Sequence, residues 1–125
     1  MSVPPALHEL EAEIMAEVWR RGESSVRDDL DALNARSDTQ RAYTTVMTVM
    51  HRLDHKGLLR RERQGRTDVY VAAIDREEYA RARAGEEVGA LVDAYGDVAL
   101  AHFARQMSKL DPERREQIRR LARGE

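Results

Sequence analysis

The fold prediction starts from residues 42–59, which read AYTTVMTVMHRLDHKGLL. At about 100° of rotation per residue, a helix over residues 40–55 separates these side chains into two faces. The apolar face consists of Ala42, Val46, Val49, Met50 and Leu53, and the opposite face consists of Tyr43, Thr44, Met47, Thr48 and His51. We expect the apolar face to pack on a protein core. The helix should end at Gly57, with Lys56 near the negative end of the helix dipole.

Two helices are predicted before this segment. Apolar residues recur at spacings of three and four between Leu7 and Trp19, and Gly22 ends that pattern. Ser25 and Asp28 resemble a capping box, which predicts that a second helix begins here. The apolar side of this second helix fades after residue 33. The chain therefore enters residues 42–59 from a pair of amphipathic helices.

A β-hairpin is predicted after the third helix. Residues 58–63 and 67–72 alternate in polarity, and Gln64, Gly65 and Arg66 supply a turn between them. Three helices followed by a hairpin is the element order of a winged helix-turn-helix. We therefore expect a mainly α protein with a small β-hairpin, in which residues 1–75 form a winged helix-turn-helix DNA-binding domain.

The rest of the chain, residues 76–125, is predicted to be a helical arm, with Asp111 and Pro112 opening its last helix. Its apolar residues exceed what a short arm can bury by itself, so pairing with a second copy is expected. The candidate dimerisation residues are Leu91, Val92, Tyr95, Leu100, Phe103 and Met107. The alternative is a monomer whose arm folds back on its own winged domain.

Composition excludes several other classes of protein. The chain has no cysteine, which excludes disulfides and thiolate metal sites, and aromatic residues are only 5%, which argues against base-stacking platforms. No apolar run approaches the length of about 18 residues that a membrane span needs, so we expect a cytoplasmic protein without membrane insertion. His51 and His55 have a metal-binding spacing but no obvious further ligand. No catalytic motif stands out, and we predict neither an enzyme nor a metal or cofactor site.

Charge singles out the third helix and the hairpin as an anion-binding surface. Residues 41–66 carry seven Arg and Lys against two acids, a net charge of +5 in a chain of net charge −2. Threonine hydroxyls and methyl groups suit base edges in the major groove of DNA, and arginines beside them suit phosphates. The candidate DNA-binding residues are Arg41, Tyr43, Thr44, Thr45, Met47, Thr48, His51, Arg52, Arg63 and Arg66. A solvated charged face, a buried protein interface and a hairpin protected from aggregation remain alternatives.

Three segments also carry a resemblance to a known family: residues 42–59 above, LEAEIMAEVW at 10–19, and Gly65-Arg66 with Val69-Tyr70. The chain resembles the BlaI/MecI family of penicillinase repressors, in particular its actinobacterial members. The resemblance implies a homodimeric repressor that reads an inverted repeat in double-stranded DNA and dimerises through its C-terminal helices. It places Thr44, Thr45 and Thr48 on the recognition helix and Arg66 at the wing tip.

The resemblance also implies a mode of release. In the characterised β-lactam systems, a membrane sensor-protease causes the repressor to be cut at an Asn-Phe bond in the C-terminal region. The nearest match here is His102-Phe103, in which histidine replaces asparagine. The cysteine-rich metal-binding tail of copper-responsive relatives has no counterpart in this chain. Two other functions stay open from the sequence: a winged helix that binds an acidic protein, and a regulator that senses a ligand directly.

Overall fold

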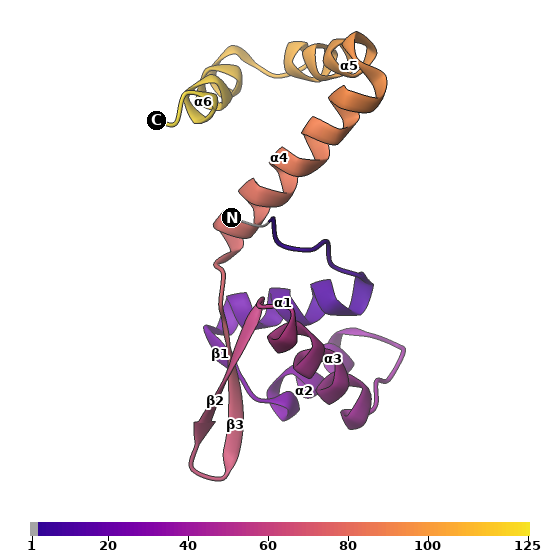
Figure 1. Ribbon diagram of the computed structural model, residues 1–125, viewed down its shortest axis with the longest axis vertical. Coiled ribbons are helices and arrows are strands. Elements are labelled where there is room, and N and C mark those ends of the chain that lie inside the picture. Colours follow the sequence, from indigo (N-terminus) through magenta and orange to yellow (C-terminus); the bar gives the residue numbers. More distant parts are fainter. Residues whose placement is uncertain (1–2) are drawn as a thin grey trace. The chain divides into compact units, whose positions relative to one another are not determined.

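The computed structural model describes residues 3–125, which form two compact units, residues 3–84 and residues 85–125. The first unit contains α1 (Glu9–Arg21), β1 (Glu23–Ser24), α2 (Val26–Arg36), α3 (Tyr43–His55), β2 (Leu59–Gln64) and β3 (Thr67–Ala72). Figure 1 shows the three helices packed beside a β-hairpin that projects from them. The predicted fold class, a winged helix-turn-helix in a mainly helical chain, is confirmed.

The first two helices begin at caps that their sequences encode. The His8 backbone N–H donates to Glu11 Oε1 at 2.9 Å at the start of α1. Ser25 and Asp28 form the predicted capping box of α2, in which each side chain accepts from the other residue's backbone N–H at 3.1 Å. Gly22 follows α1 with a φ of 89°, a left-handed conformation that glycine adopts without strain. These caps fix the turn between α1 and α2.

The third helix begins later than predicted. It starts at Tyr43 rather than at residue 40, because the preceding segment is bound to the end of α2. The Arg41 backbone N–H donates to Asn34 Oδ1 at 2.8 Å, and Gln40 Nε2 donates to the Asn34 carbonyl at 3.1 Å. Ala42 is consequently the N-cap residue and is exposed, so its predicted place on the packed face was wrong.

The rest of that apolar face is buried as predicted. Val46, Met50 and Leu53 are completely inaccessible to solvent, and Val49 is nearly so. They pack in one core with α1 and α2, and with the sheet residues Leu59 and Tyr70. Burial of such side chains contributes about 1.5–3 kcal/mol each to folding. The opposite face of α3 is therefore held on a closely packed base.

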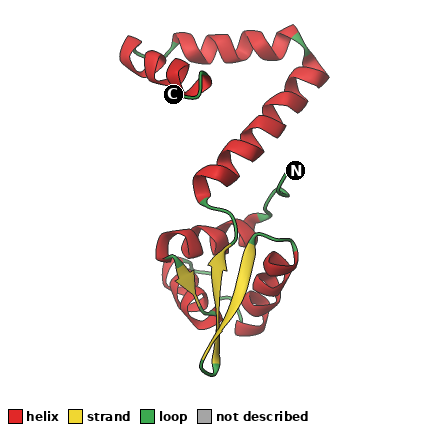
Figure 2. Ribbon diagram, turned by 60° about the vertical axis from the view of Figure 1, so that its left-hand side comes forward, coloured by secondary structure: helices red, strands yellow, loops and turns green. Residues whose placement is uncertain are grey.

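The sheet has three strands, one more than the sequence predicted. β2 and β3 form the predicted antiparallel hairpin, in which Leu59 lies opposite Ala72 and Gln64 opposite Thr67. Gly65 turns the hairpin with a φ of 64°. The two-residue strand β1 pairs with β3, so that β3 is the central strand (Figure 2). A strand of two residues carries no periodicity that a sequence pattern can detect.

The second unit is helical, as predicted. It consists of the end of α4 (Arg76–Tyr95), α5 (Asp97–Ser108) and α6 (Pro112–Ala122). Asp111 caps α6 by accepting from the Arg114 backbone N–H at 2.8 Å. Ala99 is the one buried hydrophobic residue among those that the structure describes in this unit. None of the helices in residues 3–125 is both long enough and apolar enough to cross a bilayer.

Candidate nucleic-acid interface

The outer face of α3 consists mainly of uncharged polar side chains. Thr44, Thr45 and Thr48 are exposed, and Tyr43 is 42% exposed at the first residue of the helix. His51 and Arg52 continue the exposed face toward its last turn. Met47 is half-buried and packs against the core, so it contributes less to this face than the sequence pattern predicted. The face can offer hydroxyl donors and acceptors, which can distinguish base pairs in a major groove.

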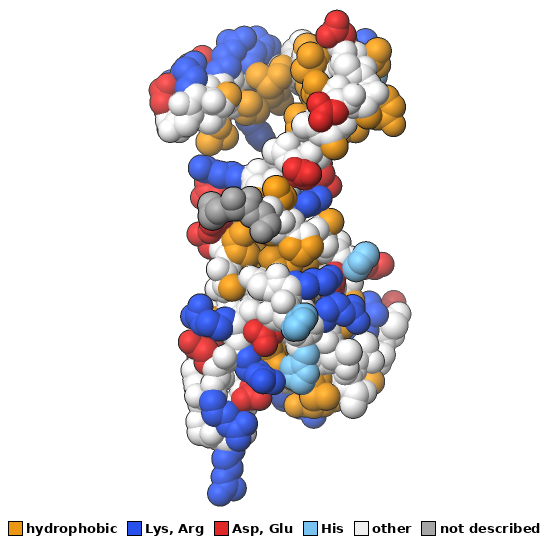
Figure 3. All heavy atoms as spheres, in the orientation of Figure 1, with side chains coloured by type: hydrophobic (Ala, Val, Ile, Leu, Met, Phe, Trp, Pro, Cys, Tyr) orange, Lys and Arg blue, Asp and Glu red, His pale blue; other side chains and the backbone are white. Residues whose placement is uncertain are grey.

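The wing, residues 59–72, carries exposed arginines on β2 and at its tip. Arg63 is held against the hairpin, because its Nε donates to the Gly65 carbonyl at 3.1 Å and its Nη1 lies 3.3 Å from Asp68 Oδ1. Arg66 lies at the tip and makes no hydrogen bond or ion pair with any residue in the described range 3–125. Figure 3 shows Lys and Arg side chains extending along the hairpin to its end. This charge is available to an anionic partner.

A cleft of about 450 Å³ lies between α2, α3 and the wing. Tyr43, Met47 and His51 line it from α3, and Arg66 and Tyr70 line it from the hairpin. Four of the predicted residues, Tyr43, Met47, His51 and Arg66, therefore share one concave surface, whereas Thr44, Thr45 and Thr48 do not line it. Two arrangements of charge around this cleft were not predicted from the sequence.

The first arrangement involves Arg27, which follows the capping box of α2. Its guanidinium lies 5.1 Å from the centre of the Tyr43 ring, a cation–π distance, and 3.8 Å from Asp31 Oδ1. Arg27 thereby places a positive charge beside the first turn of α3. The only sequence signal was its position at the start of a capped helix, where a basic residue opposes the helix dipole.

The second arrangement involves Arg61 on β2. Its Nη1 lies 3.5 Å from Nε2 of His51, and the His51 and Tyr70 rings are 6.3 Å apart. Burial raises the pKa of Tyr70, while the nearby Arg61 acts in the opposite direction. His51 thus faces the wing rather than His55. Among residues 3–125, no three His, Asp or Glu side chains converge as metal ligands.

Arg41 occupies a different environment from the other candidates. Its Nη2 lies 3.6 Å from Glu13 Oε2 of α1, and its side chain is 28% exposed. The structure therefore directs this guanidinium toward α1, whereas Arg52 is exposed on the last turn of α3. Whether Arg41 contacts phosphate stays a prediction.

Three buried carboxylates support the helices beneath this surface, and the sequence pattern revealed none of them. Burial acts to raise the pKa of Glu11, but the Lys56 ammonium at 2.8 Å and the His8 N–H outweigh it and hold the pKa below its usual value. Glu17 binds three arginines, and Asp29 is inaccessible to solvent. The Glu11–Lys56 pair joins α1 to the C-cap of α3. Each carboxylate lies on a helix face that also carries apolar residues, but its charge led us to expect exposure rather than burial.

The helix pair α2–α3, the packed base beneath it and the basic hairpin beside it define a winged helix-turn-helix protein, a class of DNA-binding transcriptional regulator. A family model described as penicillinase repressor matches residues 7–123. The chain belongs to the penicillinase repressor family, as its resemblance to BlaI and MecI proteins indicated.

Individual relatives agree with this assignment. The transcriptional regulator BlaI of Mycobacterium tuberculosis is 39% identical over 106 residues, which cover 81% of this chain and 73% of that protein. The solution structure of the DNA-binding domain of the repressor BlaI matches with a TM-score of 0.53 and 28% identity, over 63% of this chain and 94% of that one. Bacillus licheniformis BlaI, solved as a monomeric form in complex with the blaP half-operator, matches with a TM-score of 0.51 and 28% identity, over 61% and 90%.

Proposed function

We propose that this chain is a homodimeric repressor that reads an inverted-repeat operator with α3 and the wing. The observation that carries the proposal is the arrangement of α3: one face is buried in the core, and the opposite face exposes threonines beside a basic hairpin. A solvated helix in a chain with 35% charged residues would be expected to expose Lys and Glu instead.

The dimensions of B-DNA suit this surface. The major groove is about 12 Å wide and admits one α-helix, so Thr44, Thr45 and Thr48 would face base edges when α3 enters it. Arg52 and Arg66, on either side of these threonines, would bind phosphates and set the position of the helix. The complex of B. licheniformis BlaI with a half-operator supports operator DNA as the partner of this chain.

Dimerisation is proposed from the second unit. Tyr95 and Val98 are 66% and 64% exposed, and Leu91 and Leu100 are also exposed. A hollow of about 350 Å³ between α4 and α5 is lined by Leu91, Tyr95, Val98, Ala99, His102 and Phe103. A second copy of the same surface would cover these side chains, and its two-fold symmetry would match an inverted repeat.

We propose that the signal that releases the operator acts on the same C-terminal region. His102 and Phe103 both lie within α5 and line its apolar hollow. Cleavage between them by a sensor-protease would require this part of α5 to unwind, since proteolysis favours flexible, exposed segments. Cutting there would separate Phe103 and Met107 from the winged domain, whereas Leu91, Val92, Tyr95 and Leu100 would stay attached to it. The loss of this part of the proposed dimer surface would weaken operator binding.

The test is a DNA-binding titration on the purified full-length chain. We expect an inverted-repeat promoter fragment, found by genome-wide footprinting, to bind at least about a thousandfold more tightly than random duplex. The affinity should fall steeply with salt, because phosphate contacts release counterions. Sedimentation of the complex should give two chains per fragment. A winged domain that binds an acidic protein instead would show no preference among duplexes, and this outcome would refute the proposal.

A further inference from the structure

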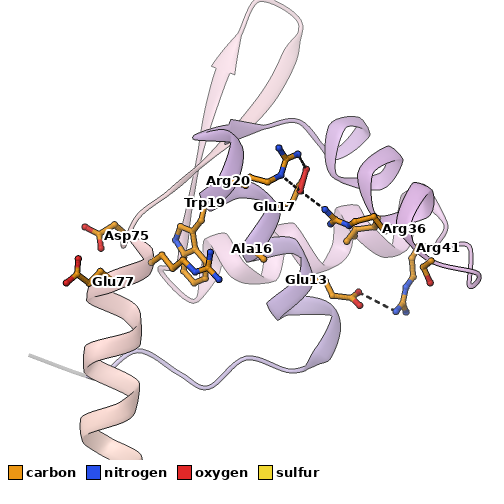
Figure 4. Close-up of a pocket in the computed structure, with 12 residues that line it drawn as sticks. Glu13, Ala16, Glu17, Trp19, Arg20, Arg36, Arg41, Asp75 and Glu77 are labelled. Atoms are coloured by element: carbon orange, nitrogen blue, oxygen red, sulfur yellow. Dashed lines mark hydrogen bonds and ion pairs between the residues drawn. The ribbon is translucent and has the colours of Figure 1, made fainter. Parts of the chain in front are cut away.

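A second cavity, of about 720 Å³, lies in the winged unit between α1, the end of α2, the loop before α3 and the first turn of α4. Figure 4 shows Ala16 in the middle of this cavity, with Trp19 toward α4 on one side and Arg36 and Arg41 on the other. None of these residues lines the cleft between α3 and the wing. DNA binding through α3 and the wing therefore does not explain this cavity.

Four arginines and four acids line the cavity, but they are unevenly placed. Asp75 and Glu77 line the end near α4 and Glu13 pairs with Arg41, so positive charge exceeds negative charge only around Glu17. Three guanidiniums, those of Arg20, Arg21 and Arg36, contact this single carboxylate, which is 1% exposed. Hydrogen bonds from Arg20 above all, against the effect of burial, lower the pKa of Glu17 to about 2, so the carboxylate is ionised at any physiological pH. Of these three arginines only Arg20 and Arg36 line the cavity, so together with Glu17 they leave one unbalanced positive charge at this end of it.

Only one of the three arginines is needed to join α1 to α2 through Glu17. Only Arg36, 3.2 Å from Glu17 Oε2, comes from another helix, whereas Arg20 and Arg21 lie on α1 itself. The Arg20 and Arg36 side chains are 62% and 53% exposed and both line the cavity. Their remaining N–H donors face solvent and can bind a second carboxylate in the fork geometry that guanidinium prefers.

The other side of the cavity contains the aromatic ring of Trp19 beside the charged residues Asp75, Arg76 and Glu77. Trp19 Nε1 donates to the Ile74 carbonyl at 2.9 Å, and its ring lies 5.5 Å from the ring of Tyr79. Trp19 is therefore held in place with one part of its ring lining the cavity. Ala16, which is exposed, leaves open the space between Trp19 and the arginines (Figure 4). A flat apolar group fits between these walls.

We propose that this cavity binds a small aromatic carboxylate, with its carboxylate between Arg20 and Arg36 and its ring over Ala16 against Trp19. The cavity also reaches Arg41, one residue before the N-cap of α3, which places such a ligand next to the start of that helix. The proposal is independent of the DNA-binding mode, because it uses none of the residues assigned to base edges.

The test uses Trp19 as a reporter, because it is the only tryptophan in the chain. Sodium benzoate replaces sodium chloride at constant ionic strength, and emission is excited at a wavelength that benzoate does not absorb. We expect a saturable change with a dissociation constant on the order of 1 mM, typical of a ligand of this size. Uncharged benzamide and ringless inorganic phosphate should each bind at least about tenfold more weakly, since each lacks one half of the recognition.

Variants on α1 locate the binding. Ala16→Leu should abolish the saturable change by filling the cavity, whereas Ala12→Leu, at an exposed position of the same helix outside the cavity, should leave it unchanged. If Ala16→Leu does not fold, backbone amide shifts of the unaltered protein serve instead, and they should cluster at residues 13–20, 33–41 and 75–77. A non-saturable response, equal binding of benzamide or phosphate, an unaffected Ala16→Leu variant, or shifts elsewhere would overturn the proposal.

Discussion

The buried carboxylate of Asp29 predicts that the protein is less stable at pH 8 than at pH 5. Asp29 lies on α2, is inaccessible to solvent, and neither of its carboxylate oxygens has a hydrogen-bond partner among the described residues. Burial raises its pKa from 3.8 to about 7, and the charge of Glu17 adds to this effect. The hydroxyl of Ser24 lowers the pKa in part, without reaching hydrogen-bonding geometry.

The sign and size of the effect follow from proton linkage. The unfolded chain releases this proton near pH 3.8, whereas the native state keeps it until about pH 7. Between these values the unfolded state binds fewer protons, so the free energy of unfolding falls as pH rises. Each pH unit in this window costs about 1.4 kcal/mol, so Asp29 alone should remove about 3 kcal/mol between pH 5 and pH 8.

The perturbation that isolates this effect is Asp29→Asn, which keeps the shape of the side chain and removes its titration. We expect the variant to match the unaltered protein within about 1 kcal/mol at pH 5 and to exceed it by about 3 kcal/mol at pH 8. The matched control is Asp31→Asn on the same helix, at a side chain that is 68% exposed. It should change stability by less than about 0.5 kcal/mol at either pH.

The assay is urea unfolding of all three proteins at pH 5, 6, 7 and 8, at one protein concentration so that assembly does not vary. All other ionisable groups are common to Asp29→Asn and the unaltered chain, so the difference in stability between these two proteins is the quantity to compare. A difference that stays constant across the four pH values would refute the reasoning, because it would show that Asp29 is already ionised in the native state at pH 5.

Other predictions concern DNA binding, assembly and acid stability. Thr48→Ala should cost about 1–3 kcal/mol at one base pair of the operator, measured by competition with single-base variants, whereas Thr39→Ala should cost nothing. Arg66→Ala should weaken binding to all duplexes alike and reduce the slope of log K against log salt by about one. Val98→Glu should turn the proposed dimer into a monomer at micromolar concentration in sedimentation, because the substitution places a charge in the apolar surface that we propose for dimerisation. Glu17→Gln should lower the free energy of unfolding at pH 7 by about 1–2 kcal/mol, allowing for solvent screening. Thermal unfolding should show this difference vanishing as the pH falls from 4.5 toward 2.

The fold was predictable from sequence where one signal dominates over a whole element. The spacing of Val46, Met50 and Leu53 placed a helix face in the core, and Gly65 placed the turn of the hairpin. The start of α3 was not predictable in this way, because Asn34 binds the backbone of Arg41 from a helix that lies apart from it in the sequence. A side-chain cap of that kind has no local pattern.

The candidate site was likewise predictable from the sequence only in part. Exposed Thr44 and Thr48 follow directly from helical periodicity once the buried face is known. The stacking of Arg27 on Tyr43 and the contact of Arg61 with His51 depend on how α2 and β2 pack beside α3, which the sequence alone does not specify. Glu11 and Asp29 were missed because we took a charged side chain as a sign of exposure. A carboxyl group can be buried when the fold supplies a partner for it or raises its pKa.

The ion pair between Glu11 and Lys56 has a consequence for the thermodynamics of recognition. It ties the C-cap of α3 to α1 at 2.8 Å, while the residue before its N-cap, Arg41, is tied to Asn34 of α2 through its backbone. Both ends of α3 are thus held in place before DNA binds. The entropy cost of ordering this helix is therefore part of folding and not part of association with DNA. Calorimetry should then assign little coupled folding of the protein to operator binding, and any large negative heat capacity change would originate in the wing tip, the DNA or the release of water from their contact.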